Sequence, residues 1–496
     1  MSILKRFCLL PVILILIISI SLGAECVEVA IENGIVVGEK KSMVASFKGI
    51  PYAQPPVGEK RWQPPTAIEK FSAPIDATSF GSSCPQRNQL FHSEDCLFIN
   101  VFTNSNFTKK DEKPVLVWIH GGGYVSGSGD LNDQVIEHWV NQDLVLVSFN
   151  YRLGALGILS HPKIDSGAGA NYSLMDMVAA LNWIQTNIGK FGGDADRVTI
   201  AGGSAGGMAI QMLMVTPKSQ GLFHRAIAQS GYGTWPFPRT PAVPALPESA
   251  NAHVLANDLI QQATDKSIND LSVAELKAIS PSALVNAISG FHLPVIDGVT
   301  LAEEPGVLFL LGKQHAVPYI SGGNSYDGSV YPYSGVQPAR MEALLGQQLE
   351  QVRSAYGLAN PSVKSLSYQH LFGDLRYVLA GMITTSAMQN SSAAGYRYFY
   401  SISPQDAPGA GHGNEVGAIF YPAKNRSQQI MQSYWRNFIE TGNPNGKGLP
   451  VWEQVSSDDE NWLIIGNQIE QAKTVREEKL SLLKQSYLQR VKAVLQ

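Results

Sequence analysis

Residues 197–206 read RVTIAGGSAG, and this stretch decides the fold of the chain. The run 197–201 is short and rich in apolar side chains, which predicts a strand buried on both faces. It leads directly into GGSAG at 202–206, a G-x-S-x-G match, and then into a helix-like stretch over 208–214. A strand, a sharp turn that carries a serine and a helix form a nucleophile elbow, in which the serine hydroxyl stands above the sheet. Ser204 is therefore the candidate nucleophile of a hydrolase.

Glycine is expected at both ends of this turn. A Cβ at Gly202 or Gly206 would collide with the neighbouring strand or helix. The chain holds 46 glycines, so a lone match is a weak signal, and the alternative is a glycine-rich structural turn. The strand before the motif and the helix after it favour the catalytic interpretation.

A second glycine run, HGGGY at 120–124, follows a buried strand predicted over 115–119. Three consecutive glycines are entropically costly, and they seldom serve packing alone. Their bare N–H groups suit the stabilisation of a developing oxyanion. We expect Gly122, Gly123 and Ala205 to supply three such donors.

An acid and a histidine must follow the serine, in that order. His412 lies in a glycine-flanked loop, GAGHG at 409–413, which would let its imidazole approach Ser204. We interpret His224 as a surface or packing residue on the helix after the elbow. Asp327 lies just beyond a strand predicted over 317–321, at the edge where the active site of a parallel sheet forms. Asp297 is the alternative acid, but its Asp-Gly turn suits a structural role better.

The rest of the chain predicts an α/β protein with a mostly parallel sheet and helices on both faces. Further buried strands are predicted over 115–119 and 144–149, and amphipathic helices over 174–189, 429–441 and 475–495. A polar, helix-rich insertion over 244–288 is expected to cover a pocket. We expect residues 25–496 to form a single catalytic domain.

The N-terminus predicts export. Two basic residues, a short apolar run and a small-residue exit make residues 1–24 a candidate signal peptide, with a membrane anchor as the alternative. We therefore expect a secreted or periplasmic protein that has no membrane span after cleavage. Cleavage would leave Cys26, Cys84 and Cys96, and a bridge between the last two would close a short loop.

The chain lacks several features of other function classes. A net charge of -4 without a block of like charges gives no reason to expect nucleic acid as a partner. No His or Cys spacing resembles a metal site, and we expect neither a metal nor a cofactor. The sequence leaves the oligomeric state open.

Together these stretches resemble the type-B carboxylesterase family, which includes the cholinesterases. The resemblance covers nearly the whole mature chain. It rests on FKGIPYA at 47–53, PP at 55–56, RW at 61–62, EDCLFINV at 94–101, the glycine run, NYR at 150–152, FGGD at 191–194, the elbow, QSG at 229–231, PVIDG at 294–298 and WRNF at 435–438. It implies the α/β-hydrolase fold, the triad and oxyanion hole given above, a Cys84–Cys96 bridge and a supporting role for Ser230 beside the acid.

Departures from the family pattern bear on the substrate. Gly203 stands where most relatives carry Glu, and the triad acid is Asp where Glu is commoner. The loop between Cys84 and Cys96 is short and holds no Trp, so it lacks the aromatic face that binds choline in cholinesterases. These departures favour neutral esters of small to medium size. The alternatives are a lipase, a thioesterase or amidase, and a non-catalytic adhesion relative.

Two aromatic residues follow Ser230. Trp235 and Phe237 are expected to wall the acyl side of the substrate pocket with apolar surface. The alternative is plain core packing beneath the insertion.

Overall fold

The computed structural model describes residues 25–87, 92–165, 167–456 and 461–496, and the predicted signal peptide lies outside them. One sheet of 13 strands runs through the described chain. The strands are β1 Glu25–Ile31, β2 Gly34–Lys41, β3 Val44–Pro51, β4 Ile75–Asp76, β5 Phe98–Asn104, β6 Lys113–Ile119, β7 Val145–Phe149, β8 Gly193–Gly203, β9 Arg225–Gln229, β10 Tyr319–Asn324, β11 Gly395–Tyr400, β12 Trp462–Ile465 and β13 Ile469–Ala472.

The sheet is parallel at its centre and antiparallel at both edges. Its order is β1-β2-β3-β5-β7-β6-β8-β9-β10-β11-β12-β13, and β4 pairs with β2. All pairs from β7 to β12 are parallel. The pairs along β1-β2-β3-β5-β7 and the pair β12-β13 are antiparallel, and the short β4 pairs with β2 in parallel. The parallel centre brings the carboxyl ends of β6, β8, β9, β10 and β11 to one edge, where loops can converge.

Fifteen α-helices lie in the described residues. They are α1 Asp133–Val140, α2 Gly154–Gly157, α3 Tyr172–Asn187, α4 Ala205–Leu213, α5 Ala252–Thr264, α6 Val273–Ala278, α7 Pro281–Asn286, α8 Pro305–Leu310, α9 Pro338–Leu345, α10 Leu349–Tyr356, α11 Leu366–Gly373, α12 Leu379–Ala387, α13 Asn414–Phe420, α14 Arg426–Thr441 and α15 Glu477–Leu495. A π-helical segment, Asp374–Val378, joins α11 to α12 without a break.

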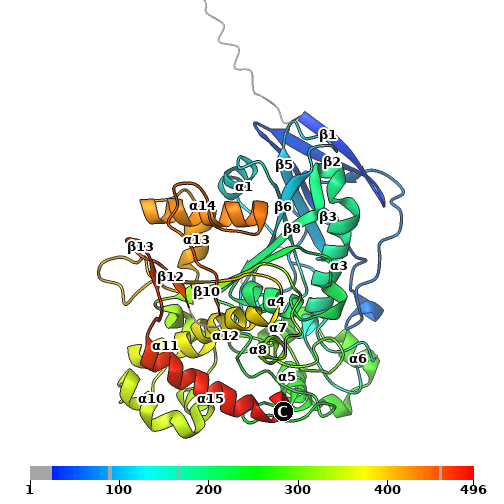
Figure 1. Cartoon of the computed structure of the whole chain (residues 1–496). Coiled ribbons are helices and arrows are strands. Elements are labelled where there is room, and N and C mark those ends of the chain that lie inside the picture. Colours follow the sequence, from blue (N-terminus) through cyan, green and yellow to red (C-terminus); the bar gives the residue numbers. More distant parts are fainter. Residues whose placement is uncertain (1–24, 88–91, 166, 457–460) are drawn as a thin grey trace, which may run out of the picture.

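Alternate side chains of the central strands enter two different cores, because successive residues of a strand point to opposite faces. On β6, Val115, Val117 and Ile119 join the core that holds α3 and α4. Leu116 and Trp118 join the core that holds α1 and α14. Figure 1 shows α1, α13 and α14 on one side of the sheet and α3 on the other. Both faces are therefore covered, as the continuous apolar runs predicted.

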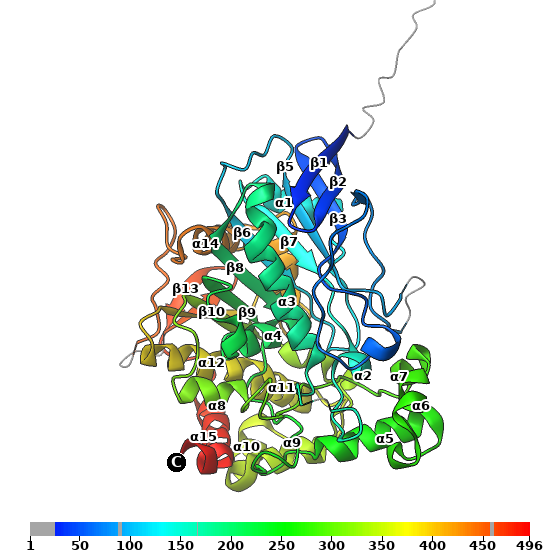
Figure 2. The same ribbon diagram turned by 90° about the vertical axis from the view of Figure 1, so that its right-hand side faces the viewer.

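The insertion over 244–288 is helical, as expected. It forms α5, α6 and α7, which share a third apolar core with Trp62 and the segment around α2. These helices lie together at the lower right of Figure 2, beyond the end of the central strands. The predicted strand at 317–321 is displaced: β10 begins at Tyr319 and extends to Asn324.

The C-terminal helix α15 is fixed by two ion pairs. Arg490 donates to both carboxylate oxygens of Glu304, and both side chains are buried. Arg476 pairs with Asp374 at 2.5 Å, at the start of the π-helical segment. This packing agrees with the helix predicted over 475–495.

The cysteines pair as the family resemblance implied. Cys84 and Cys96 form a disulfide with a Cα–Cα distance of 5.0 Å, and Cys26 is a free, exposed thiol. Of the helices in the described ranges, none is both long and apolar enough to cross a membrane.

Candidate active site

Ser204 lies at the turn between β8 and α4. Its φ of 57° and ψ of -120° are strained for a residue with a Cβ, as a nucleophile elbow requires. An added Cβ at Gly206 would lie 2.1 Å from the carbonyl oxygen of Ile119, and one at Gly202 would lie 2.6 Å from the backbone of Gly206. Both glycines are therefore required by close backbone approach. The Ser204 hydroxyl is partly exposed and has no hydrogen-bond partner in the described chain.

The glycine run after β6 lies against this turn. A Cβ at Gly121 would be 3.2 Å from Cβ of Ser204, so the two backbones are in contact. Gly122 and Gly123 have φ values of 107° and 62°, which only glycine adopts readily. Among the described residues, no acceptor takes the N–H of Gly122, Gly123 or Ala205. Three backbone donors beside the serine are thus available.

His120 fixes the start of the glycine run. Its ring stacks on Tyr151 with centroids 4.3 Å apart, and the Tyr151 hydroxyl donates to the His120 carbonyl at 2.7 Å. Burial lowers the pKa of His120 to about 4, so this imidazole is neutral near pH 7. His120 therefore acts as a packing residue, and its contacts with Tyr151 fix the backbone at the start of the glycine run.

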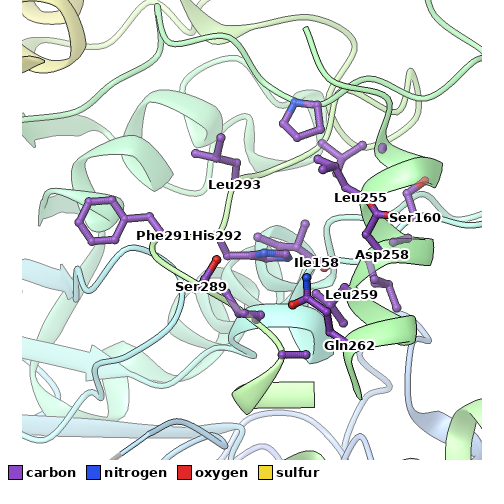
Figure 3. A pocket seen from close by; sticks show the side chains of 17 residues that line it. Ile158, Ser160, Leu255, Asp258, Leu259, Gln262, Ser289, Phe291, His292 and Leu293 are labelled. Carbon is purple, nitrogen blue, oxygen red and sulfur yellow. Dashed lines mark hydrogen bonds between the residues drawn. The ribbon is translucent and has the colours of Figure 1, made fainter. Parts of the chain in front are cut away.

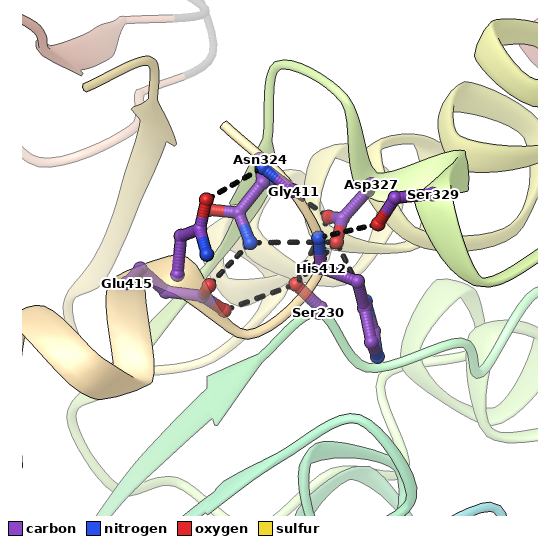
Figure 4. A network of polar contacts seen from close by, with 8 residues as sticks. Ser230, Asn324, Asp327, Ser329, Gly411, His412 and Glu415 are labelled. Atoms are coloured by element: carbon purple, nitrogen blue, oxygen red, sulfur yellow. Dashed lines mark hydrogen bonds and ion pairs between the residues drawn. The ribbon is translucent and has the colours of Figure 1, made fainter. Parts of the chain in front are cut away.

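His412 and Asp327 are in direct contact. Nδ1 of His412 lies 2.7 Å from Oδ1 of Asp327, whose carboxylate is fully buried (Figure 4). The loop that carries His412 is joined to the segment after β10 by a bridge between Tyr326 and Gly411. The backbone N–H of His412 also donates to the Ser329 hydroxyl at 2.9 Å. A buried carboxylate on Nδ1 leaves Nε2 as the ring nitrogen that can accept a proton.

Asp297, the alternative acid, lies elsewhere. Its Oδ1 accepts the backbone N–H groups of Val299, Thr300 and Leu301, and its Oδ2 accepts the N–H of Ala170 at 2.8 Å. These bonds close a turn and tie it to the start of α3. The structure brings Asp327, and not Asp297, to His412.

Asp327 lies in a hydrogen-bond network, and from the sequence only Ser230 and His412 were named among its members. The Ser230 hydroxyl lies 2.9 Å from Oδ2 of Asp327 and 3.1 Å from Oε1 of Glu415. The backbone N–H of Asn324 donates to Asp327 at 2.7 Å, and its side-chain amide donates to Glu415. Ser230 thus lies within hydrogen-bond distance of Asp327. Glu415 and Asn324 were missed, although Glu415 lies only three residues after His412.

Glu415 is a second buried carboxyl group at this site. Burial, with the nearby charge of Asp327 as the second cause, raises its pKa to about 7. Figure 4 shows Glu415 and Asp327 on opposite sides of Ser230. The site therefore holds two carboxyl groups of which one is readily protonated.

The remaining predicted residues lie as follows. Trp235 packs edge-on against Phe372, with centroids 5.7 Å apart, and Phe237 is buried in the main core.

The placement of His224 on the helix after the elbow was wrong. Helix α4 ends at Leu213, and His224 lies just before β9, where its Nδ1 accepts the N–H of Val198. In the described ranges, no three His, Cys, Asp or Glu side chains are arranged to hold a metal ion.

Fold and site together define a class. A mostly parallel sheet with a serine at a strand–helix turn, and with a histidine–aspartate pair at the same edge, is the arrangement of an α/β hydrolase. A sequence model described as the carboxylesterase family matches residues 25–483. The chain belongs to this family, and it is accordingly a serine hydrolase of carboxylic esters.

Individual relatives agree. Carboxylesterase 1F of Mus musculus is 30% identical over 508 residues, which cover 89% of this chain and 90% of that protein. Acylcarnitine hydrolase of Mus musculus is 31% identical over 482 residues, with 86% and 84% covered. Among solved structures, a PNB esterase superposes with a TM-score of 0.80 at 30% identity, covering 92% of this chain and 99% of that one. The predicted fold class and family are confirmed.

Proposed function

We propose that Ser204, His412 and Asp327 are the catalytic triad of this esterase. The observation that carries the proposal is the 2.7 Å contact between Nδ1 of His412 and a buried carboxylate, at the same sheet edge as a serine on a strained turn. The serine and histidine are not yet hydrogen-bonded, and in free hydrolases such contacts often tighten only when substrate binds.

The reaction runs in two halves. His412 takes the hydroxyl proton of Ser204 as its oxygen attacks the ester carbonyl, and Asp327 stabilises the imidazolium. The N–H groups of Gly122, Gly123 and Ala205 bind the oxyanion. His412 then returns the proton to the departing alcohol, and a water molecule cleaves the acyl-enzyme by the same steps in reverse order.

Labelling with a fluorophosphonate, followed by peptide mass spectrometry, tests this assignment. We expect one adduct, on Ser204, and at least about a 10⁴-fold loss of kcat on p-nitrophenyl butyrate in Ser204→Ala. Ser433→Ala is the matched control, because Ser433 is partly exposed on α14 and its hydroxyl bonds the carbonyl of Gln429 in the same helix. An adduct on another residue, or an active Ser204→Ala, would refute the triad.

The substrates proposed are small to medium esters without a cationic group. Gly203 contributes no carboxylate to attract a cation, and its Cα faces Val416, since a Cβ there would lie 2.8 Å from that side chain. Rates on p-nitrophenyl acetate through octanoate measure the chain-length preference. A sharp rise in rate above substrate micellisation would favour a lipase instead.

We also propose that residues 1–24 are a cleaved signal peptide, that residues 25–496 act as one catalytic domain and that the mature protein is exported. The Cys84–Cys96 disulfide supports an oxidising destination. The intact mass of the protein secreted by its host tests this, because cleavage after Ala24 predicts Glu25 as the first residue.

A further inference from the structure

Arg376 is a buried arginine beside the candidate site. It lies in the π-helical segment, only 1% of its surface is exposed, and its Nε and Nη2 have no hydrogen-bond partner in the described chain. A guanidinium stays protonated at any pH that a folded protein tolerates. A buried charge is unfavourable unless a partner compensates it. The buried charge of Arg376 therefore lacks the partner that such a charge normally has.

Other buried arginines of the described chain have polar partners. Four of them form ion pairs with carboxylates, and a fifth bonds hydroxyl and carbonyl oxygens: Arg61 with Glu94, Arg152 with Asp176, Arg239 with Glu303, Arg490 with Glu304, and Arg397 with Thr385, Ser386 and Met382. Arg376 departs from this pattern. The acid nearest to it in sequence, Asp374, is already paired with Arg476 and accepts the Tyr356 hydroxyl.

Aromatic rings enclose the guanidinium of Arg376. The carbon Cζ lies between 4.0 and 5.8 Å from five ring centroids: Tyr232 at 4.0, Trp235 at 4.7, Phe372 at 5.6, Tyr377 at 5.7 and Phe291 at 5.8 Å. We call this set the arginine cage. Ring faces attract a cation, but they do not satisfy its N–H donors.

The two tyrosines of the cage do not neutralise the charge. Burial raises the pKa of Tyr232 to about 12, and burial likewise raises the pKa of Tyr377, so both stay neutral. Both hydroxyls lie close enough to the guanidinium to interact with it, but neither reaches the distance and angle of a regular hydrogen bond, and Nε and Nη2 have no partner of that kind. The cage thus holds a full positive charge with unused donors.

The free edge of Arg376 is the edge that this chain uses elsewhere to bind carboxylates. Nε and Nη2 of Arg61 donate to the two oxygens of Glu94, and the same two nitrogens of Arg152 donate to Asp176. These parallel bonds form the bidentate fork that matches a carboxylate. Nε and Nη2 are the two unpartnered atoms of Arg376.

The arginine cage borders the candidate active site on two sides. The Tyr377 ring lies 4.6 Å from the His412 imidazole. Phe291 lies against the glycine run, because a Cβ at Gly123 would be 2.5 Å from its ring. Phe291 is also the one ring of the cage that is more than slightly exposed. Phe291 therefore separates the arginine cage from the oxyanion donors, and it covers Arg376 on that side, where Nε and Nη2 are buried.

Phe291 also lines a cavity of about 300 Å³ under the insertion. Figure 3 shows Leu255, Asp258 and Leu259 of α5 facing Ile158 across it, with the Phe291 ring on the far side from α5. A movement of Phe291 would have room on this side. The cavity meets the cage at Phe291, and the other residues of the cage do not line it.

We propose that Arg376 binds a carboxylate on the acyl part of the substrate, so that the preferred substrates are monoesters of dicarboxylic acids. The inference rests on the proposed function. It also revises the expectation of neutral substrates, which came from Gly203 and the Cys84–Cys96 loop alone. The acyl side is assigned because Trp235, the proposed acyl wall, belongs to the cage. Hydrolysis adds one water and releases the alcohol and the dicarboxylate, with the ester carbonyl carbon leaving as the second carboxylate.

Two methyl esters of matched shape test the proposal. Monomethyl glutarate carries a carboxylate where methyl 5-methylhexanoate carries an isopropyl group of similar size. We expect kcat/KM to favour the monoester by about tenfold to a hundredfold, as for one charge-assisted bidentate contact. Arg376→Met should abolish this ratio mainly through KM, and Arg376→Lys should retain part of it.

Arg61→Met is the matched control, since Arg61 is also buried, pairs with Glu94 and has no contact with the rings of the cage in the described chain. It should lower the melting temperature and leave the ratio of the two substrates unchanged. A wild-type ratio near one, or an unchanged ratio in Arg376→Met, would overturn the proposal. If Arg376→Met does not fold, competition decides: free glutarate should inhibit the wild-type enzyme more strongly than 5-methylhexanoate does, and the reverse order overturns it.

A third ester separates the two ends of the substrate. In 3-carboxypropyl butyrate the carboxylate lies on the alcohol, and a preference for this ester over monomethyl glutarate would overturn the acyl assignment. If the enzyme hydrolyses methyl 5-methylhexanoate through Ser204 but does not prefer monomethyl glutarate, this inference alone is refuted. Absence of any Ser204-dependent hydrolysis would refute the proposed function itself.

Discussion

Ser230 has one hydroxyl proton and two carboxyl groups within reach. Its oxygen lies 2.9 Å from Asp327 and 3.1 Å from Glu415, and all three side chains are buried. Burial disfavours the charged form of Glu415, and the nearby charge of Asp327 adds to this effect. With its pKa near 7, Glu415 takes up a proton under mildly acidic conditions.

This pKa predicts a pH-dependent effect of Glu415→Gln. The folded pKa of about 7 exceeds the usual 4.5, so the native state retains a proton that the unfolded state has lost. The free energy of unfolding of the wild type should therefore fall as pH rises from about 4.5 to 7, by on the order of 3 kcal/mol. The variant lacks this decline, so its stability relative to the wild type should rise over that range.

Denaturant midpoints of both proteins at pH 5, 6, 7 and 8 measure this. His120 contributes with the opposite sign between about pH 4 and 6.5, because burial lowers its pKa. That contribution is common to both proteins and cancels in their difference. A difference that is the same at pH 5 and pH 8 would contradict the assignment of Glu415.

The two candidate acids should respond differently to the same substitution. Asp327→Asn removes the negative charge from Nδ1 of His412, and kcat should fall about 10⁴-fold. Asp297→Asn weakens a structural turn, so we expect a loss of about 1–3 kcal/mol in stability and a kcat within about threefold of wild type. Burst-titrated active enzyme gives kcat per folded molecule. The opposite pattern would make Asp297 the catalytic acid.

At the scale of elements, the strand–turn–helix from β8 to α4 was predictable because its signals are local. An apolar run, two glycines at fixed positions and a helical stretch follow each other within about twenty residues. The displaced start of β10 and the place of His224 were not predictable, since Pro318 and the loop before β9 interrupt otherwise apolar patterns without marking where pairing begins.

The side chains around the triad were harder to predict than its backbone. Glu415 and Arg376 become informative only through neighbours distant in sequence: Ser230 for the first, and Trp235 and Phe291 for the second. A single sequence carries no local signal for such contacts. The π-helical segment that presents Arg376 has no periodic pattern of its own either.

The elbow predicts a steep effect of a single methyl group. In Gly206→Ala the new Cβ would lie 2.1 Å from the carbonyl oxygen of Ile119, which is backbone and cannot move aside. We expect a loss of about 1–3 kcal/mol in stability together with a lower kcat. Gly189→Ala is the matched control, because nothing lies within 4 Å of its added Cβ. Urea unfolding and turnover of both variants make the comparison, and equal behaviour would contradict the close approach.

At the scale of the whole molecule, the site depends on the order of the sheet. Gly121–Gly123 follow β6, Ser204 follows β8, Ser230 follows β9 and Asp327 follows β10, and these strands are consecutive neighbours. Residues some two hundred positions apart therefore meet at one edge. The sequence predicts a site at this edge because parallel strands place all their carboxyl ends together.

The disulfide predicts how the molecule responds to reduction. The Cys84–Cys96 bridge spans 12 positions, and closing a loop of this size stabilises by about 3 kcal/mol in the chain-entropy model. Cys84→Ser/Cys96→Ser should therefore unfold at lower urea concentration than the wild type. Cys26→Ser, at an exposed free thiol, should unfold with the wild type. An unchanged midpoint in the double variant would show that the loop is held by other contacts.

The π-helical segment between α11 and α12 amounts to a one-residue insertion that the flanking helices absorb. A π-turn holds one residue more than an α-turn, and each residue of an α-helix advances by about 100°. Deleting Leu375 would let the segment from Leu366 to Ala387 form a regular α-helix. The side chain of Arg376 would then turn away from the rings of the cage. Deleting this single residue should therefore change the preference for charged substrates. Relatives whose helix has a different length at this point are expected to differ in substrate specificity.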